Sequence, residues 1–329
     1  MTAAPPPRWS ALDLVEAFQL GHAVAALRDL ELLEALARPR TARALARGRG
    51  LDEALLRGVL DYVAARTDLV RKTGDRFVAT AGYTAAARFL VDLYAGAFAG
   101  NAIELPRLLR DPARAPRAVD RRRHARAFAA ASGSTAGVLP ALLQQLGLDH
   151  VLDLGCGSAA MLIEAATRNP ALVGWGLELH PAMRRLARGR IRAAALGRRV
   201  RILAGDCMRL ATAVPAELRA AARTLTLCHV ANEMFGDGDR RFVTWLREAR
   251  RLFPSRVLLV SDYYGRLGHE RLPVHRETLL HDFAQLISGQ GIPPANAKQW
   301  RALYRAAGCR LLHVIEDRET TRFVHLVRL

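Results

Sequence analysis

Residues 151–160, Val-Leu-Asp-Leu-Gly-Cys-Gly-Ser-Ala-Ala, limit the possible folds of this chain more than any other stretch. A short apolar run leads into two closely spaced glycines, and a helical pattern follows over Ser158–Thr167. Gly155 and Gly157 permit a tight turn and let a ligand lie against bare backbone. The helix that follows presents unpaired N–H groups to that ligand. The stretch therefore predicts a strand, a glycine bend and a helix that together bind a ligand.

Residues 147–329 alternate between short apolar runs and longer stretches with helical periodicity. Helical patterns lie, for example, over Pro181–Ala195 and Asp239–Leu252. Such alternation predicts a parallel sheet with helices on both faces. Two final runs, Arg310–Glu316 and Thr321–Arg328, predict an antiparallel pair at the end of that sheet. The runs expected to form the parallel strands are His150–Leu154, Val173–Leu179, Arg199–Leu203, Thr224–His229 and Arg256–Asp262.

The first eighty residues carry helix signals followed by a hairpin signal. Apolar residues recur at helical spacing over Ala11–Leu36. Thr41 and Asp52 are placed to cap two further short helices. Two β-like runs then flank a turn at residues 73–75. This order of helices and hairpin is typical of a winged-helix domain.

The sequence predicts three regions: a winged-helix domain over 1–80, an Ala-rich helical bridge over 81–146 and the α/β domain over 147–329. A winged helix can bind DNA through its recognition helix, which here would be Leu55–Ala65. That stretch has few exposed basic residues. We therefore expect a structural or dimerisation role for the first domain.

The net charge of +18 is the one feature of the composition that suggests a nucleic-acid partner. Lys72 and Lys298 are the only lysines, whereas arginine and alanine are abundant. A GC-rich genome produces this bias without selection for charge, so we expect no nucleic-acid partner. No apolar run reaches the ~18 residues of a membrane span, and the Pro-rich first ten residues lack a signal-peptide core. Four cysteines without a C-x-x-C pair suit free thiols in a cytoplasmic protein.

Two classes of cofactor bind at a glycine bend of this kind. The spacing of residues 155–160 also fits the dinucleotide fingerprint, which alone is a weak match. Asp153 favours S-adenosylmethionine (SAM), because a dinucleotide strand is usually apolar at that position. Asp206, after the third strand, would lie where an adenine amino group binds. Glu178 ends the second strand, where a carboxylate binds both ribose hydroxyls in either class.

The segments Asp153–Gly157, Glu178–Pro181 and Gly205–Asp206 resemble the three SAM-contact motifs of class I methyltransferases, in the family's order and spacing. The resemblance implies a Rossmann-like α/β sheet of seven strands with the last pair antiparallel. It also implies that the glycines flank the methionine part of SAM, the glutamate its ribose and the last aspartate its adenine. Ala159 stands where the family often has a third glycine, and we expect its methyl group to be tolerated. The cofactor-binding residues expected on this basis are Asp153, Gly155, Cys156, Gly157, Glu178, Leu179, Asp206 and Cys207.

The whole chain also resembles the small-molecule methyltransferases of the plant and bacterial O-methyltransferase type. These place a winged-helix module, a helical bridge and a SAM domain in this order, and the first module forms a homodimer. Many of them carry a His-Asp-Trp segment after the fourth strand, and its histidine is the general base. Here Glu233-Met-Phe stands at that place, so the usual base is missing and simple phenol O-methylation is in doubt.

Three other side chains are candidates for acting on the methyl acceptor. His229 ends the fourth strand, at the carboxyl edge where α/β proteins bind ligands. Glu233 follows four residues later and could share a helical face with it. His281 lies in the insertion before the final strand pair, a region that lines the acceptor pocket in this family. In one hypothesis the two histidines are bases for O-methylation, and in the other they are ligands of an iron or zinc ion.

The metal hypothesis resembles the metal-containing C-methyltransferases that act on α-keto acids such as phenylpyruvate or 2-ketoarginine. There the ion chelates the keto acid and stabilises its enolate, whose carbon attacks the methyl group. In both versions we expect a homodimeric, SAM-dependent enzyme that acts on a small molecule. Two other functions stay open: a regulator whose winged helix binds DNA and whose SAM domain senses ligand, and an RNA methyltransferase, which only the charge suggests.

Overall fold

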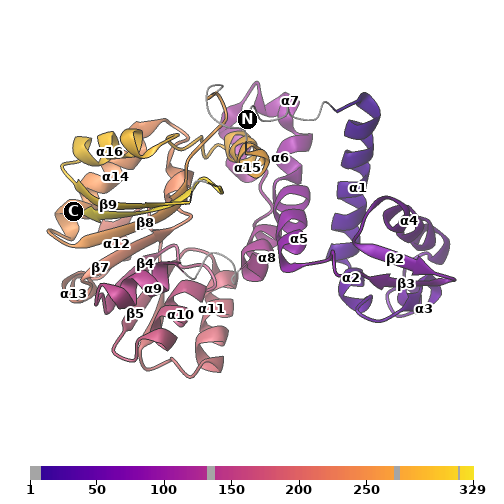
Figure 1. Cartoon of the computed structure of the whole chain (residues 1–329), viewed down its shortest axis with the longest axis horizontal. Coiled ribbons are helices and arrows are strands. Elements are labelled where there is room, and N and C mark those ends of the chain that lie inside the picture. The colour runs from indigo at the N-terminus through magenta and orange to yellow at the C-terminus, as the bar shows by residue number, and fades with distance from the viewer. Residues whose placement is uncertain (1–8, 132–137, 270–274, 318) are drawn as a thin grey trace. The chain divides into compact units, whose positions relative to one another are not determined.

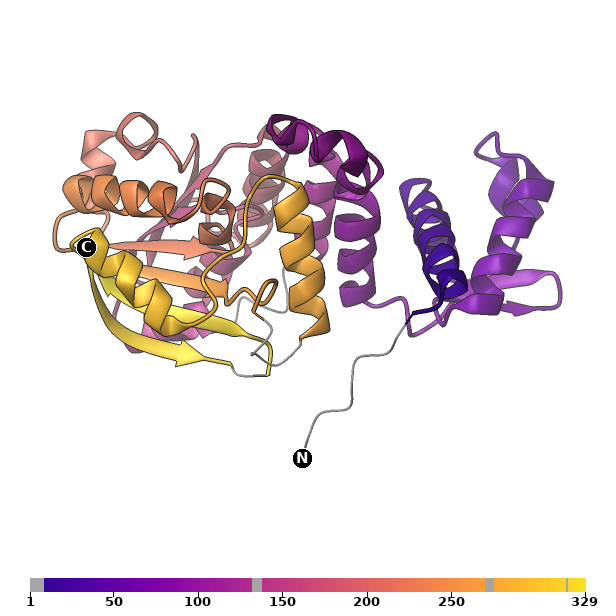
Figure 2. The same cartoon turned by 90° about the horizontal axis from the view of Figure 1, so that it is seen from above.

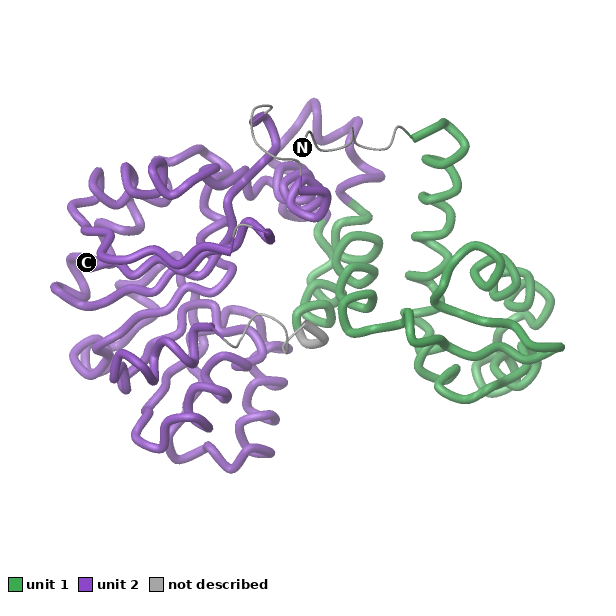
Figure 3. Tube along the Cα trace, viewed as in Figure 1, with its two compact units in different colours: residues 1–100, 119–131 green, residues 101–118, 132–329 purple. Residues whose placement is uncertain are grey.

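The computed structural model describes residues 9–131, 138–269, 275–317 and 319–329. The chain forms two compact units, shown in Figure 3. Unit 1 comprises residues 1–100 and 119–131, and unit 2 comprises residues 101–118 and 132–329. The bridge predicted over 81–146 is thus divided between the two units, and the domain boundaries drawn from the sequence stay a prediction.

Unit 1 contains helices and one small sheet. The sheet has the strand order β1-β3-β2, and both pairs are antiparallel. The side chains of Thr41 and Asp52 accept hydrogen bonds from Ala44 N at 3.1 Å and Leu55 N at 2.7 Å, so both predicted helix caps are confirmed. The elements are α1 (Ala11–Asp29), α2 (Leu32–Ala35), β1 (Arg40–Thr41), α3 (Ala42–Arg47), α4 (Glu53–Arg66), β2 (Val70–Thr73), β3 (Arg76–Ala79), α5 (Ala85–Leu90), the π-helix η1 (Val91–Ala97), the start of α6 (Ala99–Ile103) and α8 (Arg121–Ala131).

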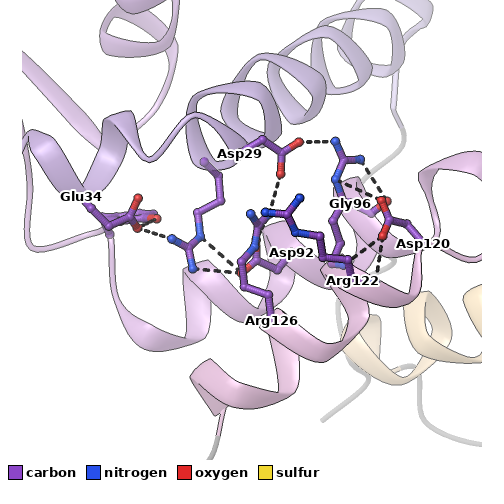
Figure 4. Close-up of polar contacts among 10 residues, drawn as sticks. Asp29, Glu34, Asp92, Gly96, Asp120, Arg122 and Arg126 are labelled. Carbon is purple, nitrogen blue, oxygen red and sulfur yellow. Dashed lines mark hydrogen bonds and ion pairs between the residues drawn. The ribbon is translucent and has the colours of Figure 1, made fainter. Parts of the chain in front are cut away.

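A buried network of charges joins three helices of unit 1 (Figure 4). The carboxylate of Asp92, on η1, is fully buried and lies 3.1 Å from Arg28 of α1 and 2.7 Å from Arg126 of α8. Arg126 also lies 2.7 Å from Asp29, which contacts Arg123 as well. Because a buried charge is stable only when it is paired, this network holds α1, η1 and α8 against one another.

Unit 2 contains a seven-stranded sheet with the order β6-β5-β4-β7-β8-β10-β9. The strands from β6 to β8 pair in parallel, and β10 is antiparallel to both β8 and β9. The predicted α/β fold class with an antiparallel last pair is confirmed. The elements are α7 (Leu105–Leu108), η2 (Pro112–Arg117), α9 (Val138–Gln145), β4 (His150–Leu154), α10 (Ala160–Arg168), β5 (Val173–Glu178), α11 (Pro181–Ala193), β6 (Val200–Ala204), α12 (Leu210–Ala213), α13 (Ala216–Ala221), β7 (Thr224–Cys228), η3 (Ala231–Met234), α14 (Asp239–Leu252), β8 (Val257–Tyr263), α15 (Arg276–Ile287), α16 (Ala297–Ala306), β9 (Arg310–Glu316) and β10 (Arg322–Arg328).

Each face of this sheet packs against its own layer of helices (Figure 1). Successive residues of a strand point to opposite faces, as β4 illustrates. Leu152 belongs to an apolar cluster with Trp245 of α14 and Trp300 of α16. Its neighbour Val151 belongs to a second cluster, with Leu162 of α10 among its members. The hydrophobic core therefore lies in two layers, one on each face of the sheet.

The chain order reverses between β4 and β7, which are neighbours in the middle of the sheet. In open α/β sheets such a switch point, at the carboxyl ends of the strands, is where ligands bind. Figures 1 and 2 show α15 beyond these carboxyl ends, beside the sheet. None of the described helices is both long enough and apolar enough to cross a membrane.

Candidate active site

The glycine bend after β4 adopts a backbone conformation that requires glycine. Gly155 and Gly157 have φ angles of +75° and +54°. A Cβ atom on Gly155 would lie 2.7 Å from Cγ2 of Val230, which follows β7. Both the left-handed φ and this close approach exclude a larger residue at position 155. The predicted bend is confirmed, and the start of η3 packs directly onto it.

Ala159 also adopts the left-handed conformation, with φ at +60°. Its methyl group is fully buried in the core under α10. The protein therefore accommodates the methyl group, as expected, but in a conformation that costs an L-residue about 1–2 kcal/mol. Strain of this kind often accumulates at functional sites.

Glu178 connects the first two cofactor motifs. One carboxylate oxygen accepts a hydrogen bond from Gly157 N at 2.9 Å, and the other accepts one from His180 N at 2.7 Å. The side chain is buried, whereas the following residue, Leu179, is exposed. The glycine bend, the end of β5 and the start of α11 therefore meet at one carboxylate.

The other two acids of the motifs flank this point. Asp153 is buried in β4 and accepts a hydrogen bond from the Thr226 hydroxyl of β7 at 2.7 Å. Burial, assisted by the negative charge of Glu178, raises the pKa of Asp153 to about 7. Asp206 follows β6 and accepts a hydrogen bond from Met208 N at 2.9 Å. Gly205 N bonds to the Glu178 carbonyl oxygen at 3.2 Å, so the third motif lies next to the second.

The two cysteines of the motifs are neutral thiols. Burial raises the pKa of Cys207 to about 12 and that of Cys156 well above its usual value. A thiol without a thiolate form is a poor nucleophile. Cys207 contributes its carbonyl oxygen instead, which accepts a hydrogen bond from the Trp245 indole at 2.8 Å. Cys156 and Cys207 therefore act in this region through shape and backbone.

His229 directly follows β7 and has a φ of +54°, which is uncommon for a residue other than glycine. The backbone N–H of His229 donates a hydrogen bond to the Ser261 carbonyl oxygen at 2.9 Å. Burial, with a smaller effect from the positive charge of Arg322, lowers the pKa of His229 to about 4. The ring is therefore neutral near pH 7 and is a weak base there.

A second cluster of polar side chains surrounds His281. His281 Nε2, on α15, lies 3.4 Å from the side-chain nitrogens of both Asn232, on η3, and Gln285, one turn later on α15. The Tyr263 ring packs edge-on against the His281 ring at 5.0 Å. Asn232 and Gln285 were not predicted from the sequence. The only signals were the position of Asn232 beside Glu233 and the four-residue spacing of Gln285 from His281.

Two buried aspartates hold this second cluster in place. Asp262, at the end of β8, accepts hydrogen bonds from Asn232 N and Tyr263 N, both at 3.0 Å. Burial raises the pKa of Asp262 to about 7. Asp282, on α15, accepts bonds from the Tyr263 hydroxyl at 3.0 Å and from Arg266 N at 2.6 Å. These bonds fasten η3 and α15 to the end of β8.

The predicted metal ligands do not form a metal site in the part of the chain that the structure describes. No three histidine, cysteine, aspartate or glutamate side chains are grouped there as a metal ion would require. Nε2 of His281 already faces two amide groups. The groups that face Nε2 are neutral amides, which suit an iron or zinc ion poorly.

The α/β domain matches a known protein family over part of its length. Residues 151–252 match the family model described as "Methyltransferase domain". This stretch is a methyltransferase domain. The match spans the glycine bend, Glu178, Asp206 and η3, so the predicted enzyme class is confirmed. No curated protein matches the chain.

Several solved structures share the fold of the whole chain. The mitomycin 7-O-methyltransferase MmcR superposes with a TM-score of 0.77 at 22% identity, over 96% of each chain. NcsB1, an O-methyltransferase from neocarzinostatin biosynthesis solved with SAM and 2-hydroxy-5-methyl naphthoic acid, gives 0.72 at 19% identity, over 98% of this chain and 99% of its own. CalO1, from calicheamicin biosynthesis, was solved with bound S-adenosylhomocysteine (SAH). It gives a TM-score of 0.64 at 20% identity, over 97% of this chain and 99% of its own. These proteins and the methyltransferase domain agree with SAM, the cofactor that the sequence predicts.

Proposed function

We propose that this chain transfers the methyl group of SAM to a hydroxyl group of a small molecule. The proposal depends on one observation above all: Glu178 bonds at once to the glycine bend and to the start of α11, with Asp206 alongside. A buried carboxylate beside bare glycine backbone suits a ribose diol, and a second acid suits an adenine amino group. Two proteins of similar structure, MmcR and NcsB1, are O-methyltransferases, which supports the hydroxyl acceptor.

The residues predicted to bind the cofactor keep these roles in the proposal. Gly155 and Gly157 would flank the methionine part, Glu178 with Leu179 the ribose, and Asp206 with Cys207 the adenine. Asp153 and Cys156 would shape the floor of the site from the buried side. SAM supplies an activated methyl group, so the protein acts mainly by holding the acceptor in line with it.

The reaction releases the proton of the acceptor hydroxyl group, and a side chain at the site can accept it. The acceptor oxygen forms a bond to the methyl carbon, the carbon–sulfur bond breaks, and the hydroxyl proton leaves. Of the predicted catalytic residues, His229 is a weak base, and His281 Nε2 faces amide N–H groups. Glu233 lies close enough to Asp262 to contribute to the raised pKa of that residue. We therefore assign proton acceptance to Glu233 and positioning to His281.

Binding measurements test the cofactor. We expect calorimetry to detect binding of SAH to the wild-type chain and none of NADH. Gly155→Val should abolish SAH binding, because its side chain would collide with Val230. Gly189→Ala, in α11, is the matched control, since a Cβ there meets nothing within 4 Å. Tight NADH binding without SAH binding would refute the proposal.

Rates with labelled SAM test the assignment of the base. Glu233→Gln should lower kcat about 100-fold, and the fall in rate toward low pH should vanish. His281→Gln should lower the rate less and leave that acid limb in place. A Glu233→Gln enzyme with an unchanged pH profile would show that the proton leaves by another route.

A homodimer through the N-terminal region, predicted from the sequence, is part of the proposal. α1 exposes a series of apolar side chains, which favours burial against a partner. We expect light scattering to report a dimer and Leu12→Glu with Phe18→Glu to yield monomers. The exposed apolar residues are Leu12, Leu14, Val15 and Phe18 on α1 and Leu30 directly after it. Location in the cytoplasm stays a prediction.

The alternative to O-methylation, C-methylation of an α-keto acid, stays a prediction that metal analysis of the purified protein can test. Bound iron or zinc, with activity on phenylpyruvate that a chelator removes, would favour it over O-methylation. The regulator and the RNA methyltransferase also stay as alternatives. A gel shift with genomic DNA at nanomolar affinity would support the regulator.

A further inference from the structure

The helix α15 has its polar and apolar faces in an unusual arrangement. The exposed face carries the apolar side chains Leu280, Phe283 and Leu286. The buried side, toward the end of the sheet, carries the polar side chains Thr278, Asp282 and Gln285 and the partly buried His281, together with the apolar Ala284 and Ile287. A core-facing helix normally buries its apolar stripe. So many polar residues on the buried side indicate that α15 packs in large part over polar groups.

Two of these buried polar side chains are fully bonded within unit 2. The Thr278 and Thr321 hydroxyls lie 2.9 Å apart. Asp282 accepts bonds from Tyr263 and from Arg266 N, and a third from Leu267 N at 2.9 Å. These contacts account for the structural part of the polar face.

The amide pair, which we define as the side chains of Asn232 and Gln285, is different. Their exposed fractions are 2% and 3%, yet among the described residues neither carbonyl oxygen has a hydrogen-bond partner. Through its single lone pair, His281 Nε2 can accept a hydrogen bond from only one of the two amide N–H groups, and neither of these contacts involves a carbonyl oxygen of the pair. Burying an unbonded carbonyl costs free energy, and such groups are rare in folded proteins. The arrangement fits a site whose bonds are completed by a ligand.

The amide pair lies close to the cofactor motifs. Asn232 follows Val230, the residue that packs against Gly155, by two positions, a chain length of at most ~7 Å. Both amide nitrogens lie 3.4 Å from the same atom of His281, so the pair occupies one small region. Glu233, to which we assign proton acceptance, is the next residue after Asn232.

We propose that the carbonyl oxygens of Asn232 and Gln285 bind the O–H or N–H hydrogens of the methyl acceptor, so that the site selects donor-bearing acceptors and rejects the methylated product. This inference rests on the proposed function. When the acceptor oxygen gains the methyl group, its hydrogen leaves as a proton and the carbonyl loses its partner. A product with O–CH3 in place of O–H would then leave a buried acceptor unpaired, which weakens its binding.

Matched pairs of small molecules test this selection on the SAH-loaded full chain. The donor probes are 1-naphthol, catechol and aniline, and their blocked partners are 1-methoxynaphthalene, 1,2-dimethoxybenzene and N,N-dimethylaniline. We expect calorimetry to show about tenfold tighter binding of at least one donor probe than of its partner. If no donor probe binds more tightly than its blocked partner, the proposal is wrong.

Near-isosteric apolar variants then locate the selection. Asn232→Leu and Gln285→Met should each reduce the preference for the donor probe to about threefold or less, with SAH affinity unchanged. Gln145→Met, on an exposed helix end, is the matched control and should keep the full preference. A preference that survives in both variants would overturn the proposal.

Unfolding separates ligand binding from a structural role. Because the carbonyls lack partners, Gln285→Met should leave the urea midpoint unchanged or raise it. A lowered midpoint together with an intact probe preference would make the amide pair structural. Loss of SAH binding by the wild-type chain would instead refute the proposed function, so the two failures are distinguishable.

Discussion

Buried and partly buried acids occur in both units of this chain, but their neighbours differ. In unit 1 they lie against arginines: the buried Asp92 contacts Arg28 and Arg126, and the partly buried Asp29 contacts Arg123 and Arg126 (Figure 4). Burial raises the pKa of Asp29, but the hydrogen bonds from Arg126 and Arg123 outweigh this effect, so its pKa lies below the usual value. Asp29 is therefore charged and paired at neutral pH.

In unit 2 the buried acids lie against neutral donors. Asp153 accepts its bond from the Thr226 hydroxyl, and Asp262 accepts from the N–H groups of Asn232 and Tyr263. Burial raises the pKa of both acids to about 7. Near neutral pH each is divided between its charged and neutral forms.

This difference distinguishes polar groups that stabilise the fold from polar groups that can bind a ligand. Paired charges in unit 1 hold helices together and have no bonding capacity to spare. At the carboxyl ends of the strands in unit 2, titrating acids and unbonded amide carbonyls keep such capacity. Perturbed groups of this kind cluster where ligands bind and react. The following predictions test that division.

The largest effect is expected for the network in unit 1. Asp92→Asn leaves the largely buried Arg28 and the half-buried Arg126 without their shared carboxylate. Removing one partner of a buried ion pair costs about 3–5 kcal/mol, and we expect a loss near 3 kcal/mol in chemical unfolding of the full chain. SAH affinity should not change.

An exposed ion pair supplies the control for this variant. Glu53→Gln breaks the surface pair with Arg57 on α4 and should cost less than about 0.5 kcal/mol. Equal unfolding curves for Asp92→Asn and the wild type would show that the buried network stabilises no more than a surface pair. Hydrogen exchange at η1 would locate the loss if it occurs.

The fold and the charged network differ in how far a sequence can predict them. The bounds of β4, β9 and α14 agree with the prediction to the residue, because periodicity and turn signals are local. Asp52 could be predicted as a cap for the same reason. Glu178 and the glycines could be placed together because adjacent parallel strands end at one edge.

The amide pair could not be predicted in this way. Asn232 and Gln285 lie on η3 and α15, far apart in the chain, and come together only through the bonds of Asp262 and Asp282 to the end of β8. No periodicity or motif records that contact. A lone asparagine or glutamine in a sequence also gives no sign of whether its carbonyl is bonded.

The second prediction concerns pH and the acids of unit 2. The folded pKa of Asp153, about 7, lies above its unfolded value of about 3.9, so folding takes up a proton between these values. Its contribution to stability is present below pH 4 and is lost as the pH rises through 7. Asp153→Asn should therefore gain roughly 2 kcal/mol relative to the wild type between pH 5 and pH 7.

Urea unfolding at both pH values measures this gain. Asp149→Asn is the control with the opposite sign, because a hydrogen bond from His150 lowers the pKa of Asp149. Its contribution is lost as the pH falls below the unfolded value. If the difference in unfolding free energy between Asp153→Asn and wild type is the same at both pH values, Asp153 stays charged in the folded protein.

The third prediction concerns Glu178, whose partners are backbone N–H groups. Glu178→Gln replaces one acceptor oxygen by a donor, which opposes either Gly157 N or His180 N. We expect SAH affinity to fall about tenfold, close to 1.4 kcal/mol. Glu178→Asp should fall by a similar amount, because its shorter side chain cannot keep both bonds. Unchanged affinity in both variants would remove Glu178 from the ribose site.

The smallest effect compares strained backbone in the two units. Glu31, before α2, and Ala159, before α10, both have left-handed φ angles, of 56° and 60°. Glu31→Gly should stabilise the chain by about 1 kcal/mol, because its side chain is exposed and only strain is removed. Ala159→Gly should stabilise it less, because a buried methyl group is lost as well. Thermal unfolding and SAH titration of both variants test this. If Ala159→Gly is more stable but binds SAH more weakly, the strain at Ala159 shapes the cofactor site. If its SAH binding is unchanged, the strain does not shape that site.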